Sequence, residues 1–169
     1  AFNMRFNATT VHRLIKWLCL PFFNEISDPK ALKKLQDHLD KTELILLDEV
    51  SMIGRTMMGR IDSRLRQGQA ADETLGGIGC VCIGDPAQCE AMFDKQLYDE
   101  TPARDDADGD EKKNTRLSNM GLGVYDEFDE VIVLTKVHRM GTIDDPQTPE
   151  DHAYNERAHK YWAIMHRLR

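Results

Sequence analysis

Two short apolar runs, separated by a stretch of helical periodicity, constrain the fold of this chain most. The first run is 44–47, and the second, 78–83, follows a glycine-rich entry. Apolar runs of this length without alternation are typical of strands that are covered on both faces. Between them, Met58, Ile61 and Leu65 recur at helical spacing, and Gly68 is expected to end that helix. Strand, helix and strand in succession predict an α/β fold, with a mainly parallel sheet flanked by helices.

Four further elements are expected around this unit. A threonine pair suited to capping opens an amphipathic helix over 9–20. An Asp-Pro pair opens a second helix over 28–40. The apolar run 131–134 predicts a third buried strand, and helical spacing returns over 154–168.

The composition is that of a water-soluble globular protein. The chain has 169 residues, enough for one packed core, and 41% of them are hydrophobic. Collagen-like, mucin-like and wholly disordered classes are excluded. No apolar run approaches the roughly 18 residues of a membrane span, and the start lacks the pattern of a secretory signal. We therefore expect an intracellular protein that does not enter a membrane.

The charge balance limits any contact with nucleic acid. The chain has 22 basic and 29 acidic residues, a formal net charge of −7. Neutralising a phosphate backbone requires a basic surface, so a free-standing electrostatic nucleic-acid binder is disfavoured. Contact with nucleic acid is expected to be local.

Two patterns that could suggest a metal do not satisfy the ligand rules. Cys80 and Cys82 flank one valine within an apolar run, a spacing unlike that of a zinc knuckle, so reduced thiols are favoured. The acidic interval 99–114 contains almost no large apolar side chain, which predicts a solvated, mobile insertion. Its alternating aspartates resemble the start of a calcium loop, but Glu111 stands where the turn needs glycine and Leu117 where a glutamate is needed.

Polar side chains follow each of the three predicted strands. Asp48 and Glu49 follow the first strand in LILLDEVSM, Gln88 follows the second in CIGDPAQ, and Arg139 follows the third in LTKVHRM. In open α/β sheets, ligands bind beyond the carboxyl ends of the strands. Each signal alone also fits an ordinary acidic turn, a Gly-Asp-Pro turn or a surface arginine. Their ordered combination predicts that all four side chains line one pocket.

In this order, the motifs resemble the superfamily-one DNA helicases that move 5′ to 3′, of the petite-integration-frequency type related to the RecD helicases. The acid pair resembles helicase motif II, the Gly-Asp turn with its glutamine motif III, and the arginine after VIVLT motif IV. The opening AFNMRFNATTVHRL is similar to motif Ia, and LYDE and GLGVYDEF are similar to connecting segments. The resemblance implies a partial RecA-like P-loop NTPase domain, which spans 1–169 and includes the acidic insertion.

The resemblance also implies a role for each matching residue. Asp48 would bind Mg²⁺, and Glu49 would be the catalytic base for ATP hydrolysis. Gln88 would sense the γ-phosphate and link its state to DNA, while Arg139 would stabilise charge on the transferring phosphoryl group. The residues near single-stranded DNA would be Thr10, His12 and Arg13. From the residues alone, a half-buried histidine with a local hydrogen bond explains His12 equally well.

Three departures from the family pattern qualify these roles. Cys89, Glu90 and Ala91 stand where a pair of prolines is common, and Met140 replaces a glutamine after the arginine. No glycine is followed by lysine, so the loop that cradles phosphates is absent. We therefore expect an internal piece of a first motor domain that is inactive alone, with the phosphate-binding loop upstream and a second motor domain downstream.

The parent protein would be a monomeric helicase that uses ATP and Mg²⁺ to unwind DNA. Single-stranded or forked DNA would be its partner, in repair, recombination or replication, and in the nucleus or mitochondrion if the organism is a eukaryote. The alternative is a non-catalytic RecA-like remnant that serves as an interaction or scaffolding module.

Overall fold

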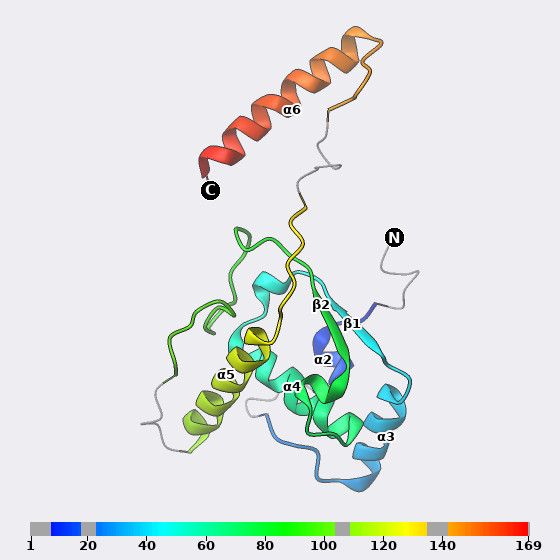
Figure 1. Ribbon diagram of the computed structural model, residues 1–169, viewed down its shortest axis with the longest axis vertical. Helices are drawn as coiled ribbons and strands as arrows, with labels where there is room; N and C mark the ends of the chain where they lie inside the picture. The colour runs from blue at the N-terminus through cyan, green and yellow to red at the C-terminus, as the bar shows by residue number, and fades with distance from the viewer. Residues whose placement is uncertain (1–7, 18–22, 104–108, 135–141, 169) are drawn as a thin grey trace. The chain divides into compact units, whose positions relative to one another are not determined.

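The computed structural model describes residues 8–17, 23–103, 109–134 and 142–168 (Figure 1). The chain divides into two compact units, Ala1–Asp129 and Glu130–Arg169. All of the sheet and most of the buried core belong to the first unit. Within the described residues, no helix is both long and apolar enough to cross a membrane.

A parallel pair of strands forms the centre of the first unit. β1 (Leu44–Leu47) pairs with β2 (Gly79–Cys82), and Leu44 lies opposite Gly79. The ladder continues past the strand ends, because the amide of Ile83 donates to the carbonyl of Leu47 at 2.7 Å and that of Val50 donates to Ile83 at 3.0 Å. Parallel neighbours need a crossover connection, and α4 (Arg55–Gln69) supplies it. The predicted α/β class is confirmed.

Only one face of this sheet is covered by described residues. Ile45 and Leu47 are buried, whereas Leu44 and Leu46 are 55% and 60% exposed. The expectation of strands covered on both faces is therefore wrong for the described part of the chain. Since successive side chains of a strand point to opposite faces, the helices that bury Ile45 and Leu47 leave the other face of β1 open.

The helices of the first unit follow their local signals to different extents. α3 (Pro29–Leu39) has the predicted bounds, and the carboxylate of Asp28 accepts from the amide of Ala31 at 2.9 Å. α2 (Val11–Leu14) is shorter than predicted, because Lys16 adopts a left-handed φ of 51°. α4 continues past Gly68 to Gln69, so the predicted stop is wrong. Gly68 instead packs closely against the side chain of Leu39.

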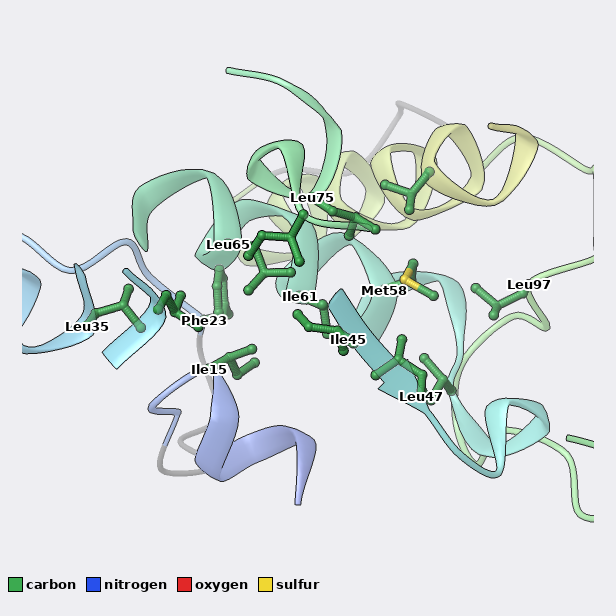
Figure 2. Packing of buried hydrophobic residues seen from close by; sticks show 14 residues of the cluster. Ile15, Phe23, Leu35, Ile45, Leu47, Met58, Ile61, Leu65, Leu75 and Leu97 are labelled. Atoms are coloured by element: carbon green, nitrogen blue, oxygen red, sulfur yellow. The ribbon is translucent and has the colours of Figure 1, made fainter. Parts of the chain in front are cut away.

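The core forms where α4 meets the sheet and the neighbouring helices (Figure 2). Met58, Ile61 and Leu65 on α4 are almost fully buried in the same cluster as Ile45 and Leu47. On its other side α4 packs against α5 (Asp110–Asp126). The two helices approach closely at glycines: a Cβ atom at Gly121 would lie 1.9 Å from the carbonyl oxygen of Arg55.

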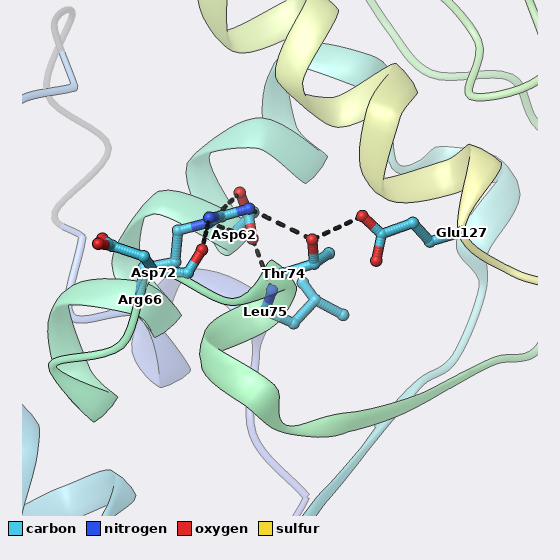
Figure 3. A network of polar contacts seen from close by, with 6 residues as sticks. All are labelled: Asp62, Arg66, Asp72, Thr74, Leu75 and Glu127. Carbon is cyan, nitrogen blue, oxygen red and sulfur yellow. Dashed lines mark hydrogen bonds and ion pairs between the residues drawn. The ribbon is translucent and has the colours of Figure 1, made fainter.

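A polar network fixes the turn that leads into β2 (Figure 3). The fully buried Asp62 on α4 accepts from Nε of Arg66 at 2.9 Å and from the amide of Leu75 at 2.6 Å. Leu75 lies in η2 (Thr74–Gly77), and Thr74 donates to Glu127 beside the end of α5 at 2.7 Å. The start of β2 is thereby attached to both α4 and α5.

The acidic interval 99–114 differs from the expected irregular insertion at both ends. Residues 110–114 form the first turn of α5. Before them, the carbonyls of Asp99 and Thr101 accept from Nη1 of Arg55, and the amide of Ala103 donates to Asn119. The buried guanidinium of Arg55 on α4 and the exposed side-chain amide of Asn119 on α5 therefore order residues that have few apolar side chains of their own.

The second unit contains one described helix and no described strand. α6 (Pro149–Leu168) covers the predicted helix and begins five residues earlier than its apolar repeat. The segment 131–134, predicted as a third buried strand, is irregular, and its four side chains are 76–86% exposed. That prediction is wrong, because no described backbone pairs with the segment.

Candidate active site

A sharp turn presents the acid pair at the carboxyl end of β1. The amide of Glu49 donates to the carboxylate of Asp48 at 3.0 Å, and Glu49 adopts a left-handed φ of 55° before η1 (Val50–Met52) begins. Such a conformation in a non-glycine residue costs on the order of 1 kcal/mol and needs support from its surroundings. The ladder bond from Val50 to Ile83 supplies support directly after the turn. Both carboxylates are exposed there.

Gln88 lies in the loop that follows β2, the neighbouring parallel strand. Gly84 passes so close to η1 that a Cβ atom there would lie 2.9 Å from the amide nitrogen of Val50. Asp85 then closes a turn: its carboxylate accepts from Ala87 and its carbonyl accepts from Gln88, both at 3.0 Å. Gln88 is exposed. The segments that carry Asp48, Glu49 and Gln88 thus leave the same edge of the sheet.

This edge has the donor types of a magnesium site. Mg²⁺ usually keeps several waters and takes one or two carboxylates together with substrate phosphates. The exposed carboxylate of Asp48 fits that requirement. Among the described residues, no three acidic, histidine or cysteine side chains gather to hold a metal without such help.

Arg139 lies outside the described residues, so the pocket predicted from four side chains stays a prediction. An open hollow of about 510 Å³ elsewhere in the first unit contains none of the predicted site residues. Its lining comes from α4, α5 and the chain after β2, namely Thr56, Phe93, Asp94, Lys95, Ala103, Asn114, Thr115 and Ser118.

The three residues predicted near DNA lie at the start of α2. Thr10 caps the helix, since its hydroxyl accepts from the amide of Arg13 at 3.4 Å, and both residues are exposed. His12 is half-buried and stacks on Trp17, with ring centroids 5.1 Å apart. The guanidinium of Arg60 covers the Trp17 ring at 4.5 Å. Thr10 and Arg13 are accessible to a ligand, while His12 also has a packing role.

Two residues that the sequence did not single out organise the surroundings of this edge. Arg55 is fully buried although it is an arginine, and Asp94 caps the start of α4 from a distant part of the chain. One local signal was available for Asp94. α4 starts after Gly54, which has no side chain to cap it, so its first amides need water or an acceptor from another part of the chain.

Comparisons with known proteins give similarity in structure only. No family model matches the chain, and no curated protein matches it. A double mutant of the Pif1 helicase from Bacteroides is 26% identical with a TM-score of 0.45, over 67% of this chain and 26% of that chain. The Bacteroides Pif1 structure in complex with ADP-AlF4 is 28% identical with a TM-score of 0.44, over 53% and 21%. The one bound to ssDNA is 25% identical with a TM-score of 0.42, over 53% and 21%. The chain spans about a quarter of these proteins' length.

Proposed function

We propose that this chain is part of the first RecA-like motor domain of an ATP-dependent DNA helicase that moves 5′ to 3′. The observation that carries the proposal is the shared edge of the sheet. Asp48 and Glu49 follow β1, and Gln88 follows the adjacent parallel strand β2. The order of these residues along the chain is the order of helicase motifs II and III.

In this proposal the acid pair divides the work of hydrolysis. Asp48 would hold Mg²⁺, and Glu49 would orient and deprotonate the water that attacks the γ-phosphate. When bound, Mg²⁺ neutralises charge that develops on the phosphate oxygens. Both carboxylates are exposed, and neither forms an ion pair within the described chain, so both are accessible to a metal ion or a water molecule.

Gln88 and Arg139 complete the nucleotide side of the proposed site. The amide of Gln88 contacts the γ-phosphate and reports its presence to the DNA-binding residues. Arg139 donates to the transferring phosphoryl group, for which the planar fork of a guanidinium is suited. The phosphates themselves need a phosphate-binding loop with a Gly-Lys pair from another part of the parent protein, since no glycine in this sequence is followed by lysine.

The proposed DNA contact is the start of α2. Thr10 and Arg13 are exposed side chains that can donate to a phosphate, and His12, which lies between them in the sequence, stacks on Trp17. The contact is local, in keeping with the net charge of −7. The parent protein would act as a monomer on single-stranded or forked DNA in genome maintenance, inside the cell and, in a eukaryote, in the nucleus or mitochondrion.

The decisive experiment is Glu49→Gln in the chain extended in both directions along its gene. Losing the base should lower DNA-stimulated ATP hydrolysis by about a hundredfold or more while ATP binding remains. Steady-state turnover and nucleotide affinity are measured together. Glu43→Gln is the matched control, because Glu43 is an exposed acid at the opposite end of β1. Undiminished turnover in Glu49→Gln would refute the proposed base.

One observation favours the second candidate, a non-catalytic interaction module. The open face of the sheet exposes apolar side chains of both strands and of the residue after β2, namely Leu44, Leu46, Val81 and Ile83. Contiguous exposed apolar side chains mark contact surfaces. The residues encoded upstream separate the two functions, because an intact phosphate-binding loop supports the motor and its loss supports the module.

A further inference from the structure

The loop that carries Gln88 starts at a fixed point beside the acid pair. Its first residue, Gly84, packs against Val50, and the amide of Val50 donates to the carbonyl of Ile83. Val50 directly follows Glu49. The start of the loop and the turn of the acid pair are therefore held together by backbone atoms.

The same loop ends at a second fixed point, at the start of α4. The carboxylate of Asp94 accepts from the amide and hydroxyl of Thr56, at 3.2 and 2.8 Å, and from the amide of Met57 at 3.2 Å. The carbonyl of the next residue, Lys95, accepts from the amide of Arg55 at 2.8 Å. Asp94 thus supplies the cap that Gly54 cannot, and it ties the returning chain to the helix that follows the acid pair.

Arg55 stabilises the chain that follows this second fixed point. Its guanidinium is fully buried and donates to four oxygens. Nη1 reaches the carbonyls of Asp99 and Thr101 at 2.9 and 2.7 Å, Nε reaches Ser118 at 3.2 Å, and Nη2 reaches the side chain of Asn119 at 2.9 Å. All four acceptors are uncharged, and through them the guanidinium joins α4 to residues 99–101 and to α5.

We infer that Asp94 and Arg55 are positioning residues for Gln88. They hold the far end of the loop 84–93 against α4, while Gly84 holds its near end against the acid pair. Phe93, directly before Asp94, adopts a left-handed φ of 58°, a strained conformation for a non-glycine residue, and its ring is fully exposed. With both ends fixed, Gln88 keeps one position relative to Glu49. We call the two fixed ends of the loop 84–93 the clamp. The effect of the clamp on hydrolysis rests on the proposed function, but the clamp itself does not.

The clamp is tested in the chain as it stands by amide exchange at Ala87 and Gln88. Neither amide contacts Asp94, because both donate to Asp85. In Asp94→Ala these amides should exchange about tenfold faster, since the loop is released at one end. Asp28→Ala is the matched control: it also removes an aspartate that caps a helix, but the hydrogen bonds described for residues 84–93 do not involve α3. Asp94→Asn, which keeps one acceptor oxygen, should give a smaller increase in the same direction.

The consequence is tested in the extended protein. Asp94→Ala should lower the DNA-stimulated kcat about tenfold and leave KM for ATP within about twofold, because only the γ-phosphate contact of Gln88 is displaced while Asp48 and the phosphate-binding loop stay in place. Asp28→Ala should change neither value. Unchanged exchange at Ala87 and Gln88 in Asp94→Ala, or an equal increase in Asp28→Ala, would overturn the clamp. If the unaltered protein hydrolyses no ATP, the proposed function fails, and the exchange experiment still decides the clamp.

Discussion

Residues 44–47 and 131–134 have nearly the same sequence character and opposite structures. Each is a run of four large apolar residues preceded by an acid. The first is β1, which pairs with β2 and buries Ile45 and Leu47. The second is irregular and exposes all four side chains.

The difference shows that a strand in this chain depends on its partners more than on its own residues. β1 has a parallel neighbour and, on one side, a helix whose buried face carries Met58, Ile61 and Leu65. The segment 131–134 has no described backbone partner and no described covering helix. High β-propensity measures how well a side chain fits a half-buried pleated surface, so it has little effect where no such surface exists.

The largest expected effect separates the two runs directly. Leu47→Ala should lower the free energy of unfolding by about 3 kcal/mol, because it removes buried methyl groups from the core. Val133→Ala should change it by less than about 0.5 kcal/mol, since Val133 is already exposed. Urea denaturation of both variants measures the two values. Equal losses would mean that residues 131–134 are buried in solution and that the contrast is false.

A second variant tests the close contact between α5 and α4, the helix that packs against the buried face of β1. Gly121→Ala would push a methyl group into the carbonyl of Arg55 and force α5 away from α4, at a cost of about 2 kcal/mol. Gly123→Ala is the control on the same helix, because its new Cβ would meet nothing within 4 Å. It should stabilise the protein by up to about 1 kcal/mol through helix propensity. Thermal unfolding of the pair should thus shift in opposite directions, and shifts of the same sign would exclude the close contact.

How much of the fold could be predicted depended on how local each signal was. The Asp-Pro start of α3 and the apolar run of β1 act on their own residues, and both elements were predicted correctly. The exposed face of β1 and the failure at 131–134 depend on which partners the chain supplies. α5 was not predicted, because its first turn has the composition of an acidic insertion and Gly121 serves close packing rather than a turn.

The candidate site divides in the same way. Parallel strands end at the same edge, so the sequence alone could place the acid pair and the Gln88 loop together. Asp94 and Arg55 could not be found in this way. Asp94 caps a helix 38 residues before it, and Arg55 donates to Ser118, 63 residues after it. Gly54 indicates that α4 has no side-chain cap of its own, but nothing in the neighbouring sequence identifies Asp94 as the cap or Ser118 as a partner of Arg55.

The open face of β1 gives a smaller effect within one strand. Leu46→Thr should change the free energy of unfolding by less than about 0.5 kcal/mol, because Leu46 is 60% exposed and threonine suits a strand. Leu47, the next residue, is buried, and its change to alanine should give the large loss of stability described above. Urea denaturation under the same conditions measures both. A loss close to that of Leu47→Ala would show that another part of the molecule covers this face.

The smallest expected effect concerns pH, and it extends the comparison to α6, the described helix of the second unit. α6 buries only Ala158 among its described side chains, so its capping contacts matter more than those of a core helix. Asp151 accepts from the amides of Thr148 and Gln147, and its own amide donates to the Thr148 hydroxyl. Hydrogen bonds from Thr148, with smaller contributions from Gln147 and His152, hold the pKa of Asp151 below its usual value.

Because the pKa of Asp151 is lower in the folded helix than in the unfolded chain, its stabilising contribution is present above about pH 4 and is lost as pH falls through the folded pKa. NMR titration should therefore show the amides of Thr148 and Gln147 changing shift below about pH 4, together with fraying of the first turn of α6. Asp151→Asn should abolish that step. Since the segment before α6 has no described core to hold it, a first turn that stayed intact at about pH 2 in both proteins would mean that burial, rather than this cap, fixes the second unit.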